Sequence, residues 1–217
     1  MKFFNTLFII TLLSISLNAK ELGVPGILPV GDAVSGKALV SQCAACHGAS
    51  GASSNSDWPN LAGQGEKYLF SQLKYFQTTE RQNPLMMAVV PYLKTLSDDQ
   101  LLDIAAYYSS LPLSLGQAKN DQTLLDRGEW LYRAGDLDKS IPACTACHGL
   151  AGKGLNQAGF PAISGQQVNY LQDTLKAYRS NTRAAGDYAS VMQAVAVNLT
   201  DADIEALANY MHGLYLQ

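Results

Sequence analysis

The sequence lacks an apolar run long enough to cross a membrane. Its longest apolar run, Phe3–Leu17, spans about 15 residues, whereas a membrane-spanning helix needs roughly 20. The run follows the basic start Met1-Lys2 and precedes the small residue Ala19, as in a cleaved secretory signal. We therefore predict a signal peptide over residues 1–19, with a retained membrane anchor as the alternative.

An excess of positive charge is also absent. The 15 Lys and Arg residues are outnumbered by 18 Asp and Glu residues, which gives a net charge of −3. A protein that binds nucleic acid generally needs a basic surface to neutralise phosphates. The composition therefore excludes a general nucleic-acid binder, and it suits docking on a basic partner protein.

Cysteine and histidine are scarce, and nearly all of them fall in two short motifs. C-A-A-C-H-G at 43–48 and C-T-A-C-H-G at 144–149 use all four cysteines and two of the three histidines. The pattern C-x-x-C-H is typical of c-type haem attachment, in which both thiols bond to haem vinyl groups and the histidine binds the iron. We predict two covalently bound haem c groups, attached at Cys43, Cys46, Cys144 and Cys147 and ligated by His47 and His148.

Two other uses of four cysteines explain less of the pattern. Two disulfides would suit an exported protein, but they leave the histidine after each pair unexplained. A structural zinc ion needs four converging ligands, and each motif supplies three. Haem is attached outside the cytoplasm, so the haem hypothesis agrees with the predicted signal peptide and places the protein in the bacterial periplasm.

The segments around the two motifs repeat after roughly a hundred residues. W-P-N-L-A-G-Q at 58–64 matches F-P-A-I-S-G-Q at 160–166. A period of this length indicates a duplicated domain and not a solenoid. Proline and glycine mark a break between the copies, so we predict an N-terminal domain over residues 20–113 and a C-terminal domain over residues 114–217.

Helical periodicity dominates both copies, and strand-like alternation is absent. In the first copy a capping box, Ser97 with Gln100, precedes apolar residues spaced as on one face of a helix. Thr200 with Asp203 is a weaker version of the same cap in the second copy. We therefore predict an all-α fold in both domains.

Methionine positions bear on the second axial ligand of each iron. A methionine there closes the site and raises the reduction potential, whereas an open position permits peroxide or oxygen chemistry. Met192 lies between the second motif and the last predicted helix. Met86 takes the matching place if Val90–Tyr92 is a three-residue insertion, and Met87 does so if the insertion has two residues. We favour Met86, and predict Met86 and Met192 as the axial ligands.

Several further residues are candidates for supporting the haems. Pro59 and Pro161 are expected near the two histidines, where a backbone carbonyl would fix the imidazole tautomer. Arg81 and Arg183 precede the methionine segments and are candidates for pairing with haem propionates, the alternative being exposed arginines. The remaining histidine, His212, is expected at the surface.

The order of these motifs resembles that of the dihaem cytochrome c4 family, periplasmic electron carriers of bacteria. The resemblance covers nearly all of the mature sequence and adds L-A-G-Q-G-E-K-Y-L at 61–69, I-P-A-C-T-A-C-H-G at 141–149 and A-G-F-P at 158–161. It implies two tandem class I cytochrome c domains, packed about a pseudo-twofold axis. It also implies electron transfer from a membrane cytochrome complex towards a terminal oxidase, with no small-molecule substrate.

The competing hypothesis is a periplasmic redox enzyme, either a dihaem peroxidase or the haem subunit of a sulfur-compound dehydrogenase. A peroxidase needs one iron with an open or displaceable ligand, so matching methionines in both copies argue against it. A docking subunit for a flavoprotein or for a membrane complex, with peripheral membrane association in the second case, would have the same haem chemistry as a free carrier.

Overall fold

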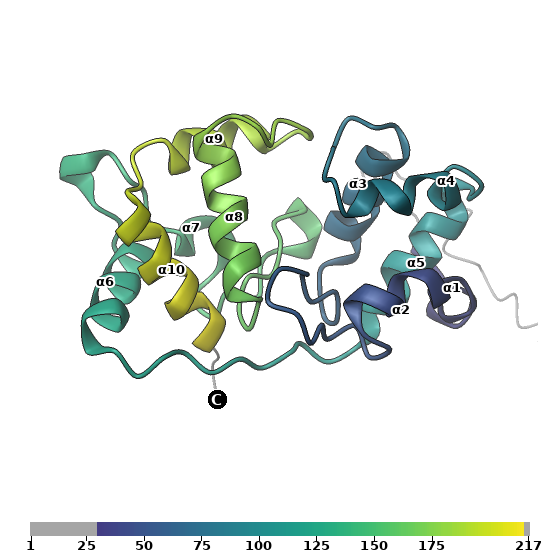
Figure 1. Ribbon diagram of the computed structural model, residues 1–217, viewed down its shortest axis with the longest axis horizontal. Helices are drawn as coiled ribbons and strands as arrows, with labels where there is room; N and C mark the ends of the chain where they lie inside the picture. The colour runs from purple at the N-terminus through teal and green to yellow at the C-terminus, as the bar shows by residue number, and fades with distance from the viewer. Residues whose placement is uncertain (1–29, 215–217) are drawn as a thin grey trace, which may run out of the picture. The chain divides into compact units, whose positions relative to one another are not determined.

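The computed structural model describes residues 30–214, and this range forms helices joined by turns and loops (Figure 1). It contains no β-strand; two isolated pairs of bridged residues occur, Asp136 with Ile141 and Leu155 with Phe160. The predicted all-α fold is therefore confirmed for the described residues. The predicted signal peptide lies outside them.

None of the helices between residues 30 and 214 has both the length and the apolar character that crossing a membrane requires.

The first copy of the repeat is built around helix α5. Its helices are α1 (Ala33–Leu39), α2 (Ser41–His47), α3 (Glu66–Gln77), the 3-10 turn η2 (Met86–Ala88), α4 (Val90–Leu93) and α5 (Asp98–Ser110). Helix α5 packs against α1 and α3. Its apolar face, with Leu101, Ile104, Ala105 and Tyr108 buried, follows the spacing predicted from the sequence.

The second copy repeats this plan around helix α10. Its elements are α6 (Gln122–Arg133), η3 (Leu137–Lys139), α7 (Thr145–His148), η4 (Asn156–Ala158), α8 (Val168–Arg179), α9 (Ala189–Ala196) and α10 (Asp201–Gly213). Helix α10 packs against α6 and α8, and α9 packs against α8 (Figure 1). The core of this copy includes Leu131, Tyr132, Ile204 and Leu207, each almost wholly buried.

A glycine lies at each place where the first helix of a copy meets the last. A Cβ atom on Gly36 of α1 would lie 1.9 Å from the backbone oxygen of Asp103 in α5. A Cβ atom on Gly128 of α6 would lie 2.4 Å from the backbone oxygen of Ala206 in α10. Both distances are below van der Waals contact, so the two helix pairs approach closely only because these residues lack a side chain.

A segment without helix, residues 111–121, joins α5 to α6 (Figure 1). It passes against the repeated heptapeptides, because a Cβ atom on Gly63 would lie 2.7 Å from the backbone nitrogen of Leu113. A Cβ atom on Gly165, at φ +65°, would lie 1.9 Å from the backbone oxygen of Ser114. The glycine in each G-Q pair therefore makes room for the connecting segment.

Both predicted helix caps are present, and the second has an additional role. Ser97 and Gln100 form the capping box of α5, and Thr200 and Asp203 form that of α10. The Asp203 carboxylate, which is only 3% exposed, also lies 2.7 Å from Arg127 of α6. Burial raises the pKa of Asp203, but hydrogen bonds from Thr200 and Arg127 outweigh it and lower that pKa to about 2.

Asp203→Asn is expected to lower the free energy of unfolding at pH 7 by about 2 kcal/mol, because charge-assisted hydrogen bonds to Arg127 and Thr200 are lost. The folded-state pKa is depressed, so the carboxylate stabilises the fold fully above its usual pKa of 3.8. That stabilisation is lost as the pH falls towards 2. Urea unfolding at pH 7 and at pH 2 should therefore show a smaller pH dependence for the variant. Asp201→Asn, which alters an exposed carboxylate in the same turn, is the control and should change the unfolding midpoint little.

Candidate haem sites

Each predicted iron-binding histidine ends a short helix and is held by a proline carbonyl. His47 closes α2, and its Nδ1 donates a hydrogen bond to the Pro59 oxygen at 2.8 Å. His148 closes α7, and its Nδ1 donates to the Pro161 oxygen at 2.9 Å. Because a carbonyl only accepts, the proton must reside on Nδ1, which leaves the Nε2 lone pair of each ring free for a metal. The expected support from the two prolines is confirmed, and the acceptor is the carbonyl of the proline itself.

The two histidines are buried as well as oriented. They are 7% and 8% exposed, respectively. Burial lowers the pKa of both imidazoles, although the hydrogen bond to each proline carbonyl raises it. Both rings are therefore neutral near pH 7, which is the form that binds iron.

The four cysteines lie on the same short helices as the histidines, or directly before them, and none of the four forms a disulfide. Cys43 and Cys144, the first cysteine of each motif, pack against the core of their copy. Burial raises the pKa of the Cys43 thiol, and it raises the pKa of the Cys144 thiol to about 11. The histidine and both cysteines of each motif are thus close neighbours, as covalent attachment of one haem requires.

The two candidate methionines of the first copy differ in burial. Met86 is partly buried and packs against the cluster of Phe76, Leu93 and Leu101, whereas Met87 is 39% exposed. The structure therefore places Met86 against the core and Met87 towards solvent, and the choice of Met86 as the axial ligand stays a prediction.

The second copy holds its methionine on a continuous helix. Met192 lies in α9 and packs against the core of its copy. In the first copy the corresponding stretch is divided into η2 and α4, and Pro91 lies in the first turn of α4. This break coincides with the insertion Val90–Tyr92 inferred from the sequence, so the proline starts a new helix after the methionine turn.

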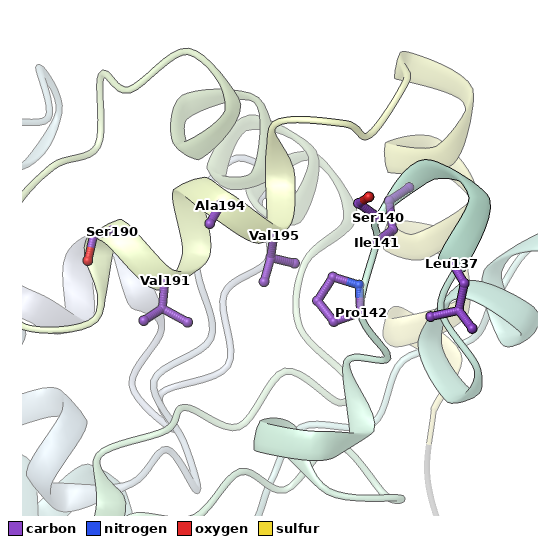
Figure 2. Close-up of a pocket in the computed structure, with 8 residues that line it drawn as sticks. All are labelled: Leu137, Ser140, Ile141, Pro142, Ser190, Val191, Ala194 and Val195. Carbon is purple, nitrogen blue, oxygen red and sulfur yellow. The ribbon is translucent and has the colours of Figure 1, made fainter.

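A largely apolar cavity of about 660 Å³ lies between the chain that leads into the second motif and helix α9 (Figure 2). It is lined by Leu137, Ser140, Ile141, Pro142, Ser190, Val191, Ala194 and Val195. Val191 and Val195 extend from α9 on the side facing Pro142 (Figure 2). Cys144 follows one wall in the sequence, and Met192 belongs to the helix that forms the other. The lining does not include Cys144, Cys147, His148 or Met192, so the cavity lies beside the second motif and not at its predicted haem ligands.

Two arginines, Arg81 and Arg183, donate to the same amide oxygen. Neither forms an ion pair with an acidic residue within the described range 30–214. Arg81 donates to Gln72 Oε1 at 2.7 Å, and Arg183 donates to the same atom at 3.3 Å. Arg183 is only 9% exposed and also donates to the Tyr68 hydroxyl at 2.9 Å. The hydroxyl of Tyr170 lies near both cations, which lower its pKa against the effect of burial.

Placing the buried Arg183 guanidinium beside a second, partly exposed one is costly unless an anion balances the charge. Haem propionates would supply that negative charge, and a guanidinium matches carboxylate geometry. The arginines present therefore fit the acidic edge of a haem. The alternative that Arg183 is an ordinary exposed arginine is wrong.

Two glutamines, not identified from the sequence as functional, connect the two copies. Gln64 and Gln166 end the repeated heptapeptides, and each is almost fully buried, at 5% and 6% exposure. Each binds the backbone of the opposite copy through both atoms of its amide group. Their repetition in the sequence was visible, but partners about a hundred residues away were not.

His212, expected at the surface, is partly buried, and its Nδ1 lies 2.8 Å from the Gln166 backbone oxygen.

Comparisons with known proteins identify relatives over most of the chain. The Cytochrome c family model matches residues 33–112 and 126–214. Cytochrome c4 of Pseudomonas aeruginosa is 40% identical over 195 residues, which cover 89% of this chain and 94% of the relative. The crystal structure of reduced recombinant cytochrome c4 from Pseudomonas stutzeri superposes with a TM-score of 0.80 at 41% identity, covering 86% of this chain and all of that one. A thiosulfate dehydrogenase electron acceptor of Thiomonas intermedia is 37% identical over 179 residues, covering 79% of this chain and 77% of the relative.

Proposed function

The chain belongs to the cytochrome c4 family of dihaem electron-transfer proteins, and from this premise we propose that it carries electrons between respiratory-chain partners in the periplasm. A membrane cytochrome complex is the proposed donor, and a terminal oxidase is the proposed final acceptor. The chain holds two covalently bound haem c groups and is an electron-transfer protein, not an enzyme. Its haem iron supplies the chemistry, which is uptake and release of one electron at a time.

The observation that carries the proposal is that each copy holds a buried histidine with its Nε2 free, and a partly buried methionine. Cys43 and Cys46 would attach one haem, with His47 and Met86 as axial ligands. Cys144 and Cys147 would attach the other haem, with His148 and Met192 as its axial ligands. With these residues bound, a side chain on each face of the haem would leave no position for a substrate, and the coordination would stay unchanged between the two oxidation states. Little reorganisation then accompanies electron transfer.

Oxidised and reduced absorption spectra, with a redox titration, test the proposed function. We expect two haems per chain, both low-spin, with the far-red band of iron–methionine ligation in the oxidised protein. The reason is that His47 and His148 have a free Nε2 and that each copy holds a partly buried methionine. A high-spin haem that binds peroxide or carbon monoxide would instead indicate the enzyme hypothesis.

Arg81 and Arg183 are proposed to bind the haem propionates. Arg183→Leu should therefore lower the reduction potential of at least one haem, because the lost positive charge had favoured the ferrous state, which carries one negative charge more. The expected fall is about 60 mV, equivalent to a tenfold change in the equilibrium for one electron. Arg133→Leu removes an exposed arginine that already pairs with Glu129, and it should leave both potentials unchanged in a redox titration.

A second candidate function is that of electron acceptor for a sulfur-compound dehydrogenase. The Thiomonas intermedia relative, described as a thiosulfate dehydrogenase electron acceptor, favours it. Reduction rates of the purified protein with a thiosulfate dehydrogenase and with a quinol-oxidising membrane cytochrome complex would separate the two functions. Co-sedimentation with membranes would identify peripheral association.

A further inference from the structure

The two buried glutamines make matching contacts in opposite directions. Gln166 Oε1 accepts from the Asn60 N–H at 2.7 Å, and Gln166 Nε2 donates to the Asn60 oxygen at 2.9 Å. Gln64 Oε1 accepts from the Ala162 N–H at 2.7 Å, and Gln64 Nε2 donates to the Ala162 oxygen at 2.8 Å. Each glutamine therefore binds the backbone N–H and the backbone oxygen of one residue in the opposite copy, using both polar atoms of its side-chain amide.

The residue that each glutamine binds, Asn60 or Ala162, directly follows the proline whose carbonyl accepts a hydrogen bond from the histidine. The Asn60 N–H and the Pro59 carbonyl belong to one peptide group, and that carbonyl accepts from His47. In the second copy, one peptide group accepts from His148 through its carbonyl and donates through its N–H to Gln64. A single planar peptide thus links each histidine to a glutamine of the opposite copy.

Hydrogen bonds joined through one amide strengthen each other. A peptide whose N–H is engaged carries more negative charge on its oxygen, so it accepts more strongly from the imidazole Nδ1. A stronger acceptor at Nδ1 raises the basicity of Nε2. A more basic axial nitrogen stabilises ferric over ferrous iron and lowers the reduction potential.

We propose that Gln166 and Gln64 are positioning residues that act between the copies: each increases the basicity of the axial histidine of the opposite copy and so lowers that haem's reduction potential. The proposal rests on the proposed ligation of iron by His47 and His148. It gives the contact between the copies a function beyond holding them together, because each haem's potential then depends on the fold of the other copy.

A neighbouring glutamine provides a matched control for the effect of losing a hydrogen bond between the copies. Gln167 Nε2 also reaches the opposite copy and donates to the Ser53 oxygen at 2.7 Å and, less closely, to the Asn60 side-chain oxygen at 3.3 Å. The Ser53 carbonyl is not the acceptor of either haem histidine. Loss of the Gln167 contact therefore removes a hydrogen bond between the copies without touching a peptide that holds His47 or His148.

The test compares Gln166→Leu, Gln64→Leu and Gln167→Leu in the full haem-loaded protein. NMR redox titration follows each haem separately, with signals assigned through the axial histidines. Gln166→Leu should raise the potential of the haem at His47, and Gln64→Leu that of the haem at His148. The expected size is a threefold to tenfold change in the electron equilibrium, where tenfold corresponds to about 59 mV. Gln167→Leu should move neither potential.

A second readout is the Nδ1 proton of the axial histidine in the reduced, diamagnetic protein. Gln166→Leu weakens the hydrogen bond to Pro59, so the proton signal of His47 should move upfield. Gln166→Glu keeps an acceptor for the Asn60 N–H and adds charge, so the same signal should move downfield and the potential of that haem should fall. This reversal of sign is not expected of a residue that only holds the copies together.

The inference is overturned if Gln166→Leu and Gln167→Leu shift both potentials alike, if a glutamine variant shifts only the haem of its own copy, or if neither potential moves. Failure of the proposed function has a different signature. In that case the unmodified protein itself would lack two low-spin haems ligated by His47 and His148.

Discussion

Met86→Ala is expected to remove the far-red iron–methionine band from one of the two haems, leaving about half of its intensity. The potential of that haem should fall by more than about 59 mV, a tenfold change in equilibrium for one electron, because methionine ligation favours ferrous iron. The physical reason is that alanine has no sulfur to bind the iron, and Met86, which is partly buried against Phe76, Leu93 and Leu101, is the predicted ligand. Absorption spectra of the oxidised protein and a redox titration measure both effects.

Met87→Ala is the matched control, since Met87 is adjacent and 39% exposed. It should keep both bands and both potentials. Met192→Ala should reproduce the Met86 result at the other haem. If instead Met87→Ala removes the band and Met86→Ala retains it, the insertion after the methionine turn has two residues and the assignment in the first copy is wrong.

Gly128→Ala is expected to lower the free energy of unfolding of the second copy by about 2 kcal/mol. Alanine gains up to about 1 kcal/mol over glycine in a helix. The added Cβ, however, would lie 2.4 Å from the Ala206 oxygen, and forcing apart a well-packed contact costs about 3 kcal/mol. The steric cost should exceed the gain in helix propensity, because the atom that the Cβ would meet belongs to the backbone and cannot move aside as the end of a flexible side chain can.

Urea unfolding, followed by the band of the haem in each copy, measures this effect. Glu129→Ala changes the next residue of α6, which is exposed, and should shift the free energy of unfolding by less than about 0.5 kcal/mol. Gly36→Ala should have the corresponding effect in the first copy, where the distance to the Asp103 oxygen is 1.9 Å. A stabilised Gly128→Ala protein would show that helix propensity dominates at this crossing.

Features set by nearby residues could be predicted from the sequence. The attachment motifs and the capping boxes each span a few residues, so their chemistry and geometry are local. The helical spacing of Leu101 to Tyr108 and its repeat in α10 predicted which faces are buried. The duplication was visible because each of these local patterns occurs twice, and membership of the cytochrome c4 family confirms the resemblance drawn from their order.

Features that depend on distant residues could not be predicted in the same way. The choice between Met86 and Met87 depends on which side of the turn η2 faces the core. The sequence does not determine this, because the length of the insertion after the turn is ambiguous. Asp203 was identified as a cap, but its ion pair with Arg127 joins residues 76 positions apart. The contacts of Gln64 span 98 positions. The division of the domains between residues 113 and 114 stays a prediction.

The connecting segment 111–121 also constrains how such a protein evolves. Because Leu113 and Ser114 press against Gly63 and Gly165, the segment is part of the contact between the copies and not a tether. A recombination event that exchanged one copy for that of a relative would have to bring along a segment fitting both glycines. The two copies of the duplicated domain are therefore fitted to each other through this segment.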